Sequence, residues 1–329
     1  GIAIVAEDAE QLSVEVPAFK VDVTREVDVI EEVLRIYGYN NIALKPQIKS
    51  SLNTTEKPDK EAVLNQIADL LIANGFREIL SNSLTKLAYV DNEEQAVRLL
   101  NPLSSDLDTM RQNLLFSALT AVSYNQKRRS VNLKFFEYGK SYFKLAEGYQ
   151  ERQNMALCMT GNVSEEQWQG AEQKQSFFHL KSAVDRIIGR LHIPGLQIVE
   201  PENSYFDYGL TYMKGQKALV TFGAVSAANL KKADVDGQVF YAEFDWDIVI
   251  RSIRKNQIKF QEVSKFPAVR RDLALLVDES VSFEQLKQIA VKSERKLLKS
   301  INIFDVYRGD KLPVGKKSYA LSFMLQDDE

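Results

Sequence analysis

Four carboxylates near the start of the chain have the types and spacing of a cation site. They are, in order, Asp22, Asp28, Glu31 and Glu32. The last three occupy positions i, i+3 and i+4 of a helical segment, so their side chains share one sector of its surface. Carboxylates gathered this way repel one another unless a cation intervenes, and Mg²⁺ takes hard oxygen ligands of this kind. The spacing alone also fits a solvated acidic face, because acids are favoured in the first turns of a helix.

The second candidate for a binding surface is the C-terminal part of the chain. Residues 264–329 carry twelve Lys and Arg against ten Asp and Glu, whereas the preceding 263 residues have a net charge of −5. This asymmetry favours the C-terminal part as the contact for a polyanion. The candidate RNA-binding residues are Arg270, Arg271, Phe266 and Tyr307. The rings of Phe266 and Tyr307 can stack on bases, but aromatic residues beside strands more often belong to a core. A surplus of two positive charges also fits an ordinary protein surface.

Composition and missing motifs exclude several classes of protein. The chain has 329 residues, is 45% hydrophobic and has a net charge of −3, which is typical of a globular protein rather than a disordered or collagen-like one. One cysteine and two histidines exclude an internal disulfide and a Cys/His zinc site. The local signatures of serine hydrolases, zinc proteases and dinucleotide-binding enzymes are missing.

Hydropathy predicts a cytoplasmic protein without a membrane partner. No apolar run reaches the roughly 18 residues that a membrane span requires, and the N-terminus lacks the pattern of a signal peptide. The first residue is Gly rather than Met, which indicates a fragment or a processed chain.

The elements that position these residues can be predicted from periodicity. Residues 19–23 alternate like a strand, and Thr24 then caps a helix whose apolar residues recur at helical spacing until Gly38. Residues 41–60 hold two prolines and no periodicity, which predicts a linker. A helix is predicted over residues 60–74, and a second one from residues 108–109 to the basic residues 126–129.

The order of the later elements decides the fold class. Strands are predicted over residues 133–143, 154–161 and 211–226, the last with a hairpin turn at 214–216, and a helix over 178–191. This order does not repeat as βαβ, so an α+β fold with an antiparallel sheet and flanking helices is predicted. From residue 264 the order becomes strand, helix, strand, strand, with a capping box at 282–285, and this is the first two thirds of a ferredoxin-like βαββαβ unit.

Three parts of the sequence carry a resemblance to one known family, the β subunit of bacterial phenylalanyl-tRNA synthetase. VPAFKVDVTREVDVIEEVLRIYGYNNI (16–42) resembles its small metal-associated domain. LLNPLSSDLDTMRQNLLFSALTAVSYNQKR (99–128) and FFEYGKSYF (135–143) resemble its catalytic-like core. FPAVRRDLA (266–274), FDVYRG (304–309) and GKKS (315–318) resemble its ferredoxin-fold anticodon-binding domain. The matches follow the order of the family and cover nearly the whole chain.

The resemblance implies a domain layout. Residues 1–45 would be the C-terminal part of the small strand–helix domain, residues 46–258 a class II synthetase-like core that does not itself catalyse, and residues 259–329 an incomplete anticodon-binding domain. A complete ferredoxin-like unit has a second helix and a fourth strand, so we expect the protein either to extend beyond Glu329 or to hold this domain loosely.

The resemblance also implies a function within an (αβ)₂ enzyme that attaches phenylalanine to its tRNA with ATP as a substrate. The β chain would scaffold the α subunit and contact phenylalanine tRNA, and it would supply no catalytic residue. In agreement, no Arg lies between residues 130 and 137 to bind an ATP phosphate. The family's magnesium ligands have the pattern D-x5-D-x2-E-E, which Asp22, Asp28, Glu31 and Glu32 reproduce, so Mg²⁺ shared with the α subunit is implied.

One departure and two alternatives remain. Residues 206–210 (FDYGL) replace the family's His-Pro-Gly-Arg-like stretch, so the role of that stretch is in doubt for this chain. The family's N-terminal tRNA-binding module and editing domain do not lie in this sequence, so hydrolysis of mischarged tRNA is not assigned to it. The alternatives are a stand-alone RNA-binding or scaffolding protein and a metal-dependent hydrolase, and the hydrolase lacks a nearby base or nucleophile.

Overall fold

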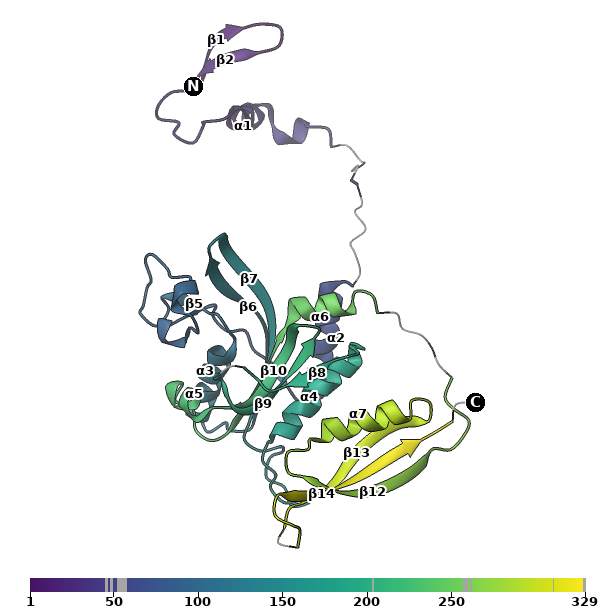
Figure 1. Cartoon of the computed structure of the whole chain (residues 1–329). Coiled ribbons are helices and arrows are strands. Elements are labelled where there is room, and N and C mark those ends of the chain that lie inside the picture. The colour runs from purple at the N-terminus through teal and green to yellow at the C-terminus, as the bar shows by residue number, and fades with distance from the viewer. Residues whose placement is uncertain are drawn as a thin grey trace. The chain divides into compact units, whose positions relative to one another are not determined.

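The chain forms two compact units, residues 1–66 and residues 67–329 (Figure 1). The computed structural model describes residues 1–44, 47, 50–51, 58–202, 204–256, 260, 262–309 and 311–327. The predicted linker at 41–60 therefore lies partly outside the described residues. Among those described, no helix combines the length and the apolar character needed to cross a membrane.

The first unit contains a hairpin and a helix. Strands β1 (Ala3–Glu7) and β2 (Leu12–Glu15) pair antiparallel, and α1 spans Glu26–Tyr37. The predicted strand over residues 19–23 is wrong, because this segment forms turns. The Lys20 N–H donates to the Pro17 carbonyl (2.9 Å) and the Val23 N–H to the Lys20 carbonyl (3.2 Å). These local bonds occupy backbone groups that a sheet ladder would need.

The second unit is built on a seven-stranded sheet in the order β3-β6-β7-β11-β10-β9-β8. Only the β3–β6 pair is parallel, so the prediction of an antiparallel sheet with flanking helices is confirmed in outline. The predicted turn at 214–216 is confirmed, since Lys214 and Lys217 pair across it. The strands are β3 (Arg77–Glu78), β6 (Leu133–Leu145), β7 (Gly148–Thr160), β8 (Gln197–Val199), β9 (Phe206–Lys214), β10 (Lys217–Val225) and β11 (Val239–Asp245).

Helices cover both faces of this sheet because its central strands alternate between two apolar sets. On β11, Tyr241 packs in the same cluster as α3 (Leu115–Gln126). The side chains of its neighbours Phe240 and Ala242 point to the opposite face of the sheet and are buried there. Strand β11 also contacts α4 and α6. The α-helices between residues 60 and 253 besides α3 are α2 (Lys60–Ala73, which spans the boundary between the units), α4 (Phe177–Arg190), α5 (Ala227–Lys232) and α6 (Trp246–Ile253).

The start of α3 differs from the prediction. Thr109–Met110 form the short strand β5, which pairs with β4 (Leu84–Thr85), and the helix begins only at Leu115. The intervening residues, Arg111 to Asn113, are buried and polar, and their side chains bond to other segments. These bonds hold the backbone outside the helix and delay its start.

The last 66 residues contain a three-stranded antiparallel sheet in the order β12-β14-β13 with one helix. The predicted order of strand, helix and hairpin is confirmed, and so is the capping box, since Ser282 and Gln285 bond reciprocally. Leu321 of the central strand is buried between Leu273 and Ile303. The elements are β12 (Val269–Asp278), α7 (Phe283–Ser293), β13 (Leu298–Tyr307) and β14 (Lys316–Leu325).

Candidate functional site

Among the four acids Asp22, Asp28, Glu31 and Glu32, Asp28 caps the N-terminus of α1. Its carboxylate accepts hydrogen bonds from the Thr24 N–H (3.0 Å), the Arg25 N–H (2.8 Å) and the Arg25 guanidinium (3.0 Å). The guanidinium bond and the two backbone bonds lower the pKa of Asp28 to about 2. The predicted cap at Thr24 is therefore wrong, because the N-cap residue is Arg25 and the acceptor is Asp28.

Among the residues that the structure describes, the other three acids do not share hydrogen-bond or ion-pair partners with Asp28. Glu32 forms ion pairs with Lys20 (3.1 Å) and Arg35 (2.7 Å), whereas Asp22 and Glu31 are exposed. In the part of the chain that the structure describes, no three His, Cys, Asp or Glu side chains come together as a metal-binding group. As folded, the Asp28 carboxylate caps α1 and the Glu32 carboxylate pairs with two cations, so the magnesium site stays a prediction.

The predicted RNA-binding arginines lie side by side on β12 and point to opposite faces of its sheet, as successive strand residues do. The Arg270 side chain pairs with Asp272 (2.7 Å) and lies 5.2 Å from the Phe304 ring centre. The pair with Asp272 raises the pKa of Arg270. Both arginines are exposed, but only Arg270 pairs with Asp272, so Arg271 is the arginine more available to a phosphate.

The two predicted aromatic residues are half exposed, and Tyr307 lies far from Arg270 on this sheet. Phe266 is 50% exposed and Tyr307 is 42% exposed. Tyr307 lies in one row with Ser318 and Leu276, whereas Arg270 is six positions along β12 from Leu276. At about 3.4 Å per residue this places Tyr307 roughly 20 Å from Arg270. The structure thus does not gather the four predicted residues into one patch.

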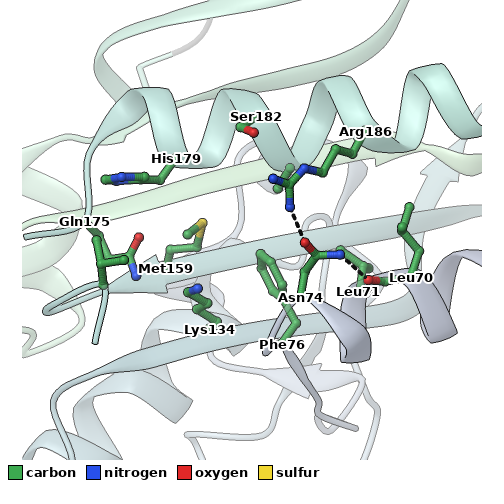
Figure 2. Close-up of a pocket in the computed structure, with 12 residues that line it drawn as sticks. Leu70, Leu71, Asn74, Phe76, Lys134, Met159, Gln175, His179, Ser182 and Arg186 are labelled. Carbon is green, nitrogen blue, oxygen red and sulfur yellow. Dashed lines mark hydrogen bonds between the residues drawn. The ribbon is translucent and has the colours of Figure 1, made fainter. Parts of the chain in front are cut away.

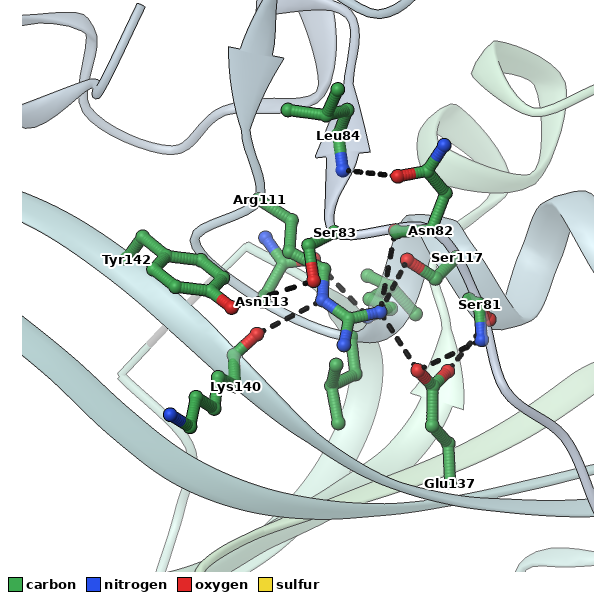
Figure 3. Close-up of polar contacts among 12 residues, drawn as sticks. Ser81, Asn82, Ser83, Leu84, Arg111, Asn113, Ser117, Glu137, Lys140 and Tyr142 are labelled. Atoms are coloured by element: carbon green, nitrogen blue, oxygen red, sulfur yellow. Dashed lines mark hydrogen bonds and ion pairs between the residues drawn. The ribbon is translucent and has the colours of Figure 1, made fainter. Parts of the chain in front are cut away.

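A buried ion pair joins three segments of the second unit (Figure 3). Arg111 Nη1 lies 2.8 Å from Glu137 Oε1, and these side chains are only 4% and 1% exposed. Arg111 Nε also donates to the Lys140 carbonyl (2.9 Å), and the Ser81 hydroxyl donates to Glu137 (2.7 Å). This arrangement satisfies both charges, so Arg111 is committed to the fold and is not free to bind a ligand.

A polar pocket of about 350 Å³ opens beside this pair, on the sheet face that carries α3. We call it the sheet-face pocket. Three carboxylates line it, from Asp91, Glu243 and Asp245, against a single cation, Arg152. Its other lining residues are Gln112, Asn113, Ser141, Phe143, Asn154, Tyr205, Phe206, Ala218, Val220, Thr221 and Tyr241. The surplus of negative charge makes the pocket unsuited to a polyphosphate.

Glu243 is the buried acid of this pocket. Its carboxylate accepts hydrogen bonds from the Tyr241 hydroxyl and from the Leu114 N–H (3.2 Å). Burial is the largest effect on this group and raises the pKa of Glu243 to about 7, because the charged form loses its hydration. The bonds from Tyr241 and Leu114 oppose this shift. Glu243 therefore changes its charge near neutral pH.

Three family profiles match the chain in order. They are the tRNA synthetase B5 domain over residues 1–39, the phenylalanyl-tRNA synthetase beta chain CLM domain over residues 44–246, and the ferredoxin-fold anticodon-binding domain over residues 264–329. The second alone covers more than half of the chain. The chain belongs to the phenylalanyl-tRNA synthetase beta-chain family.

Relatives in this family extend well beyond the present sequence. The chain is 43% identical to the phenylalanine–tRNA ligase beta subunit of Bacteroides fragilis and 37% identical to that of Porphyromonas gingivalis. These alignments cover 99% and 100% of this chain but 42% of each relative. Among solved structures, pyrrolysyl-tRNA synthetase from Desulfitobacterium hafniense aligns at 16% identity with a TM-score of 0.46, over 59% of this chain and 68% of that chain.

In this beta-chain family member, sequence reasoning missed the sheet-face pocket and the buried ion pair. The segment over residues 239–245 (VFYAEFD) is an apolar run of strand length that is interrupted by one Glu. That pattern could have indicated a buried acid. Arg111 and Glu137 carry no comparable local signal, since they lie 26 residues apart.

Proposed function

We propose that this chain is the part of a phenylalanine–tRNA ligase beta subunit that scaffolds the α subunit and contacts tRNA, without carrying out the ligation chemistry. The observation that carries the proposal is the match of three family domains, in order, over nearly the whole chain. The proposed layout has the small domain at 1–45, the synthetase-like core at 46–258 and the anticodon-binding domain at 259–329. The ligase would work as an (αβ)₂ tetramer with ATP as a substrate.

The sheet-face pocket supports a core that does not itself bind ATP. Its three carboxylates outnumber its one cation, Arg152. The nearby Arg111 is held by Glu137 and three further acceptors, from Lys140, Ser117 and Asn82. A triphosphate needs cations or backbone N–H groups facing it, and this pocket supplies a mostly negative lining instead.

The test is exchange of pyrophosphate into ATP in the presence of phenylalanine. We expect no exchange by this chain alone and full exchange when the full-length beta subunit is combined with its α subunit. Co-purification of the two subunits checks the scaffolding part of the proposal. Exchange by the pure chain would overturn the assignment of the chemistry to the α subunit, and binding to RNA without any α partner would favour the stand-alone RNA-binding alternative.

The contribution of β12 to tRNA binding can be measured through its salt dependence. Replacing Arg271 by Gln in the two-subunit enzyme is expected to reduce the slope of log K against log salt by about 0.7 to 0.9, the value for one lost phosphate contact. Arg270→Gln should change the slope less, because Asp272 already pairs with that guanidinium. Lys140→Gln, which removes an exposed cation of the core, is the control. Equal slopes for the parent and Arg271→Gln would remove Arg271 from the tRNA surface.

The magnesium site at Asp22, Asp28, Glu31 and Glu32 stays a prediction, and the structure sharpens its test. Asp28 cannot be replaced cleanly, because it caps α1. The Glu31 side chain makes no hydrogen bond or ion pair with any residue that the structure describes, so Glu31→Gln leaves the helix intact. We expect this variant of the two-subunit enzyme to bind Mg²⁺ about tenfold more weakly in equilibrium dialysis, whereas Glu26→Gln in the same helix should bind as the parent does. Matching affinities for both variants would mean an ordinary acidic face.

A further inference from the structure

A second cavity lies on the other face of the large sheet, under α4 (Figure 2). We call it the α4 cavity. Its floor includes Lys134 and Met159, which are cross-strand partners on β6 and β7. Their neighbours Phe135 and Cys158 pack on the opposite face, with α3. The cavity measures about 160 Å³ and is lined by Leu70, Leu71, Asn74, Phe76, Lys134, Met159, Val163, Gln175, His179, Ser182, Ala183 and Arg186.

A buried hydrogen-bond acceptor in this cavity has no donor. Gln175 is only 5% exposed, and its Nε2 donates to the Asn162 carbonyl (3.2 Å). Its Oε1 accepts no hydrogen bond from the residues that the structure describes. Figure 2 shows this oxygen directed into the space between Met159 and His179. Because buried acceptors are nearly always paired, a molecule in the cavity, either water or a ligand with a donor group, would complete this one.

The cavity also carries positive charge without a counter-charge. No Asp or Glu is among its lining residues. Within the described part of the chain, the Lys134 side chain makes no ion pair or hydrogen bond, and the Arg186 guanidinium donates only to Asn74, a neutral side chain. His179 Nδ1 accepts from the Ser176 N–H (3.0 Å), so the proton of the neutral ring is on Nε2. These groups together complement an anion.

The remaining wall is apolar and limits the size of the occupant. Leu70, Leu71, Phe76 and Met159 supply this wall. A cavity of about 150 Å³ with apolar walls holds a molecule of benzene's size, so an occupant has roughly six to ten heavy atoms. An inorganic anion would leave the apolar wall without contacts, and an uncharged hydrocarbon would leave Lys134 and Gln175 unpaired.

We propose that the α4 cavity binds a small organic carboxylate that carries a hydroxyl or ammonium donor beside the carboxylate, which is the chemistry of an apolar α-hydroxy or α-amino acid. Lys134 pairs with the carboxylate, Gln175 Oε1 accepts from the α-donor, and the side chain packs on Phe76 and Met159. The proposal is independent of the ligation function, because the cavity lies on the sheet face opposite to the sheet-face pocket.

The experiment uses the full-length beta subunit assembled with its α subunit, and 2-hydroxy-4-methylpentanoate as the probe. The hydroxy acid lacks the ammonium group of an amino acid, which reduces its binding to an amino-acid site elsewhere in the enzyme. Isothermal titration should detect binding, and 4-methylpentanoate, which has no donor, should bind about tenfold more weakly. The uncharged 4-methylpentane-1,2-diol should also bind at least tenfold more weakly.

Variants locate the binding. Lys134→Met and Gln175→Leu should each raise the dissociation constant about tenfold or more, Lys134→Arg should restore most of the affinity, and the exposed Lys217→Met on β10 should change nothing. Circular dichroism verifies that each variant is folded, and Lys134→Met alone suffices if Gln175→Leu does not fold. The proposal is overturned if the hydroxy acid does not bind, if Lys134→Met binds it as the parent does, or if inorganic phosphate competes with equal affinity.

Discussion

Replacing Arg111 by Met is expected to lower the free energy of unfolding of the second unit by about 3–5 kcal/mol, because it leaves a buried carboxylate without its cation. The Glu137 side chain is 1% exposed, so water cannot replace the guanidinium. Urea unfolding followed by fluorescence measures the loss. Trp246 is 1% exposed and reports on the core, and Trp168→Phe removes the exposed second tryptophan from the signal.

Two comparisons show whether the charge is responsible. The double variant Arg111→Met with Glu137→Met should recover much of the lost stability, since a pair of apolar side chains leaves no buried charge. Lys140→Met breaks an ion pair between Lys140 on β6 and Glu151 on β7, but both side chains are about half exposed, at 42% and 55%. It should cost less than about 1 kcal/mol. If Arg111→Met costs no more than Lys140→Met, the buried pair does not stabilise the fold as described.

The second large effect is the pH dependence caused by Glu243. Its folded pKa is about 7, above the ordinary value of 4.5. Between these values the folded protein holds a proton that the unfolded chain has released, so the contribution of Glu243 to stability is greatest below pH 4.5 and is lost as the pH rises through 7. A pKa difference of this size changes the free energy of unfolding by about 3 kcal/mol across this pH range.

Glu243→Gln isolates this contribution. The amide keeps an acceptor for the Tyr241 hydroxyl and the Leu114 N–H but does not titrate. We therefore expect the variant to gain about 3 kcal/mol relative to the parent between pH 4.5 and pH 8, measured as the difference between two series of urea titrations. The size of the difference in unfolding free energy at any one pH depends on the hydrogen bonds of the new amide. The change of that difference with pH does not. A difference that stays constant over this range would contradict the raised pKa.

Local signals in the sequence were sufficient for several elements. The capping box at Ser282 and Gln285 correctly predicted α7, and the glycine turn at 214–216 correctly predicted the β9–β10 hairpin. These features depend on residues within a few positions of each other, so neighbouring side chains and backbone torsions determine them. The family itself also followed from contiguous motifs, whose residues stand next to each other in the chain.

Local patterns failed where two local arrangements compete. Residues 19–23 alternate like a strand, but their backbone groups bond within turns instead. Asp28 has the spacing of a metal ligand, yet the free N–H groups of Thr24 and Arg25 at the start of α1 take its carboxylate. In both cases the sequence pattern named the right residues, and the nearest available hydrogen-bond partners decided their role.

The sequence alone therefore determined the fold class, the order of the later elements and the family, because these depend on periodicity and on contiguous motifs. The tertiary structure decided which distant side chains meet. Arg111 and Glu137 lie 26 residues apart, and Leu114 meets Glu243 across 129 residues. Gln175 lines the same cavity as Leu70 only because α4 and the end of α2 pack on one sheet face. Such contacts depend on strand register and helix packing, which no single local segment of the sequence determines.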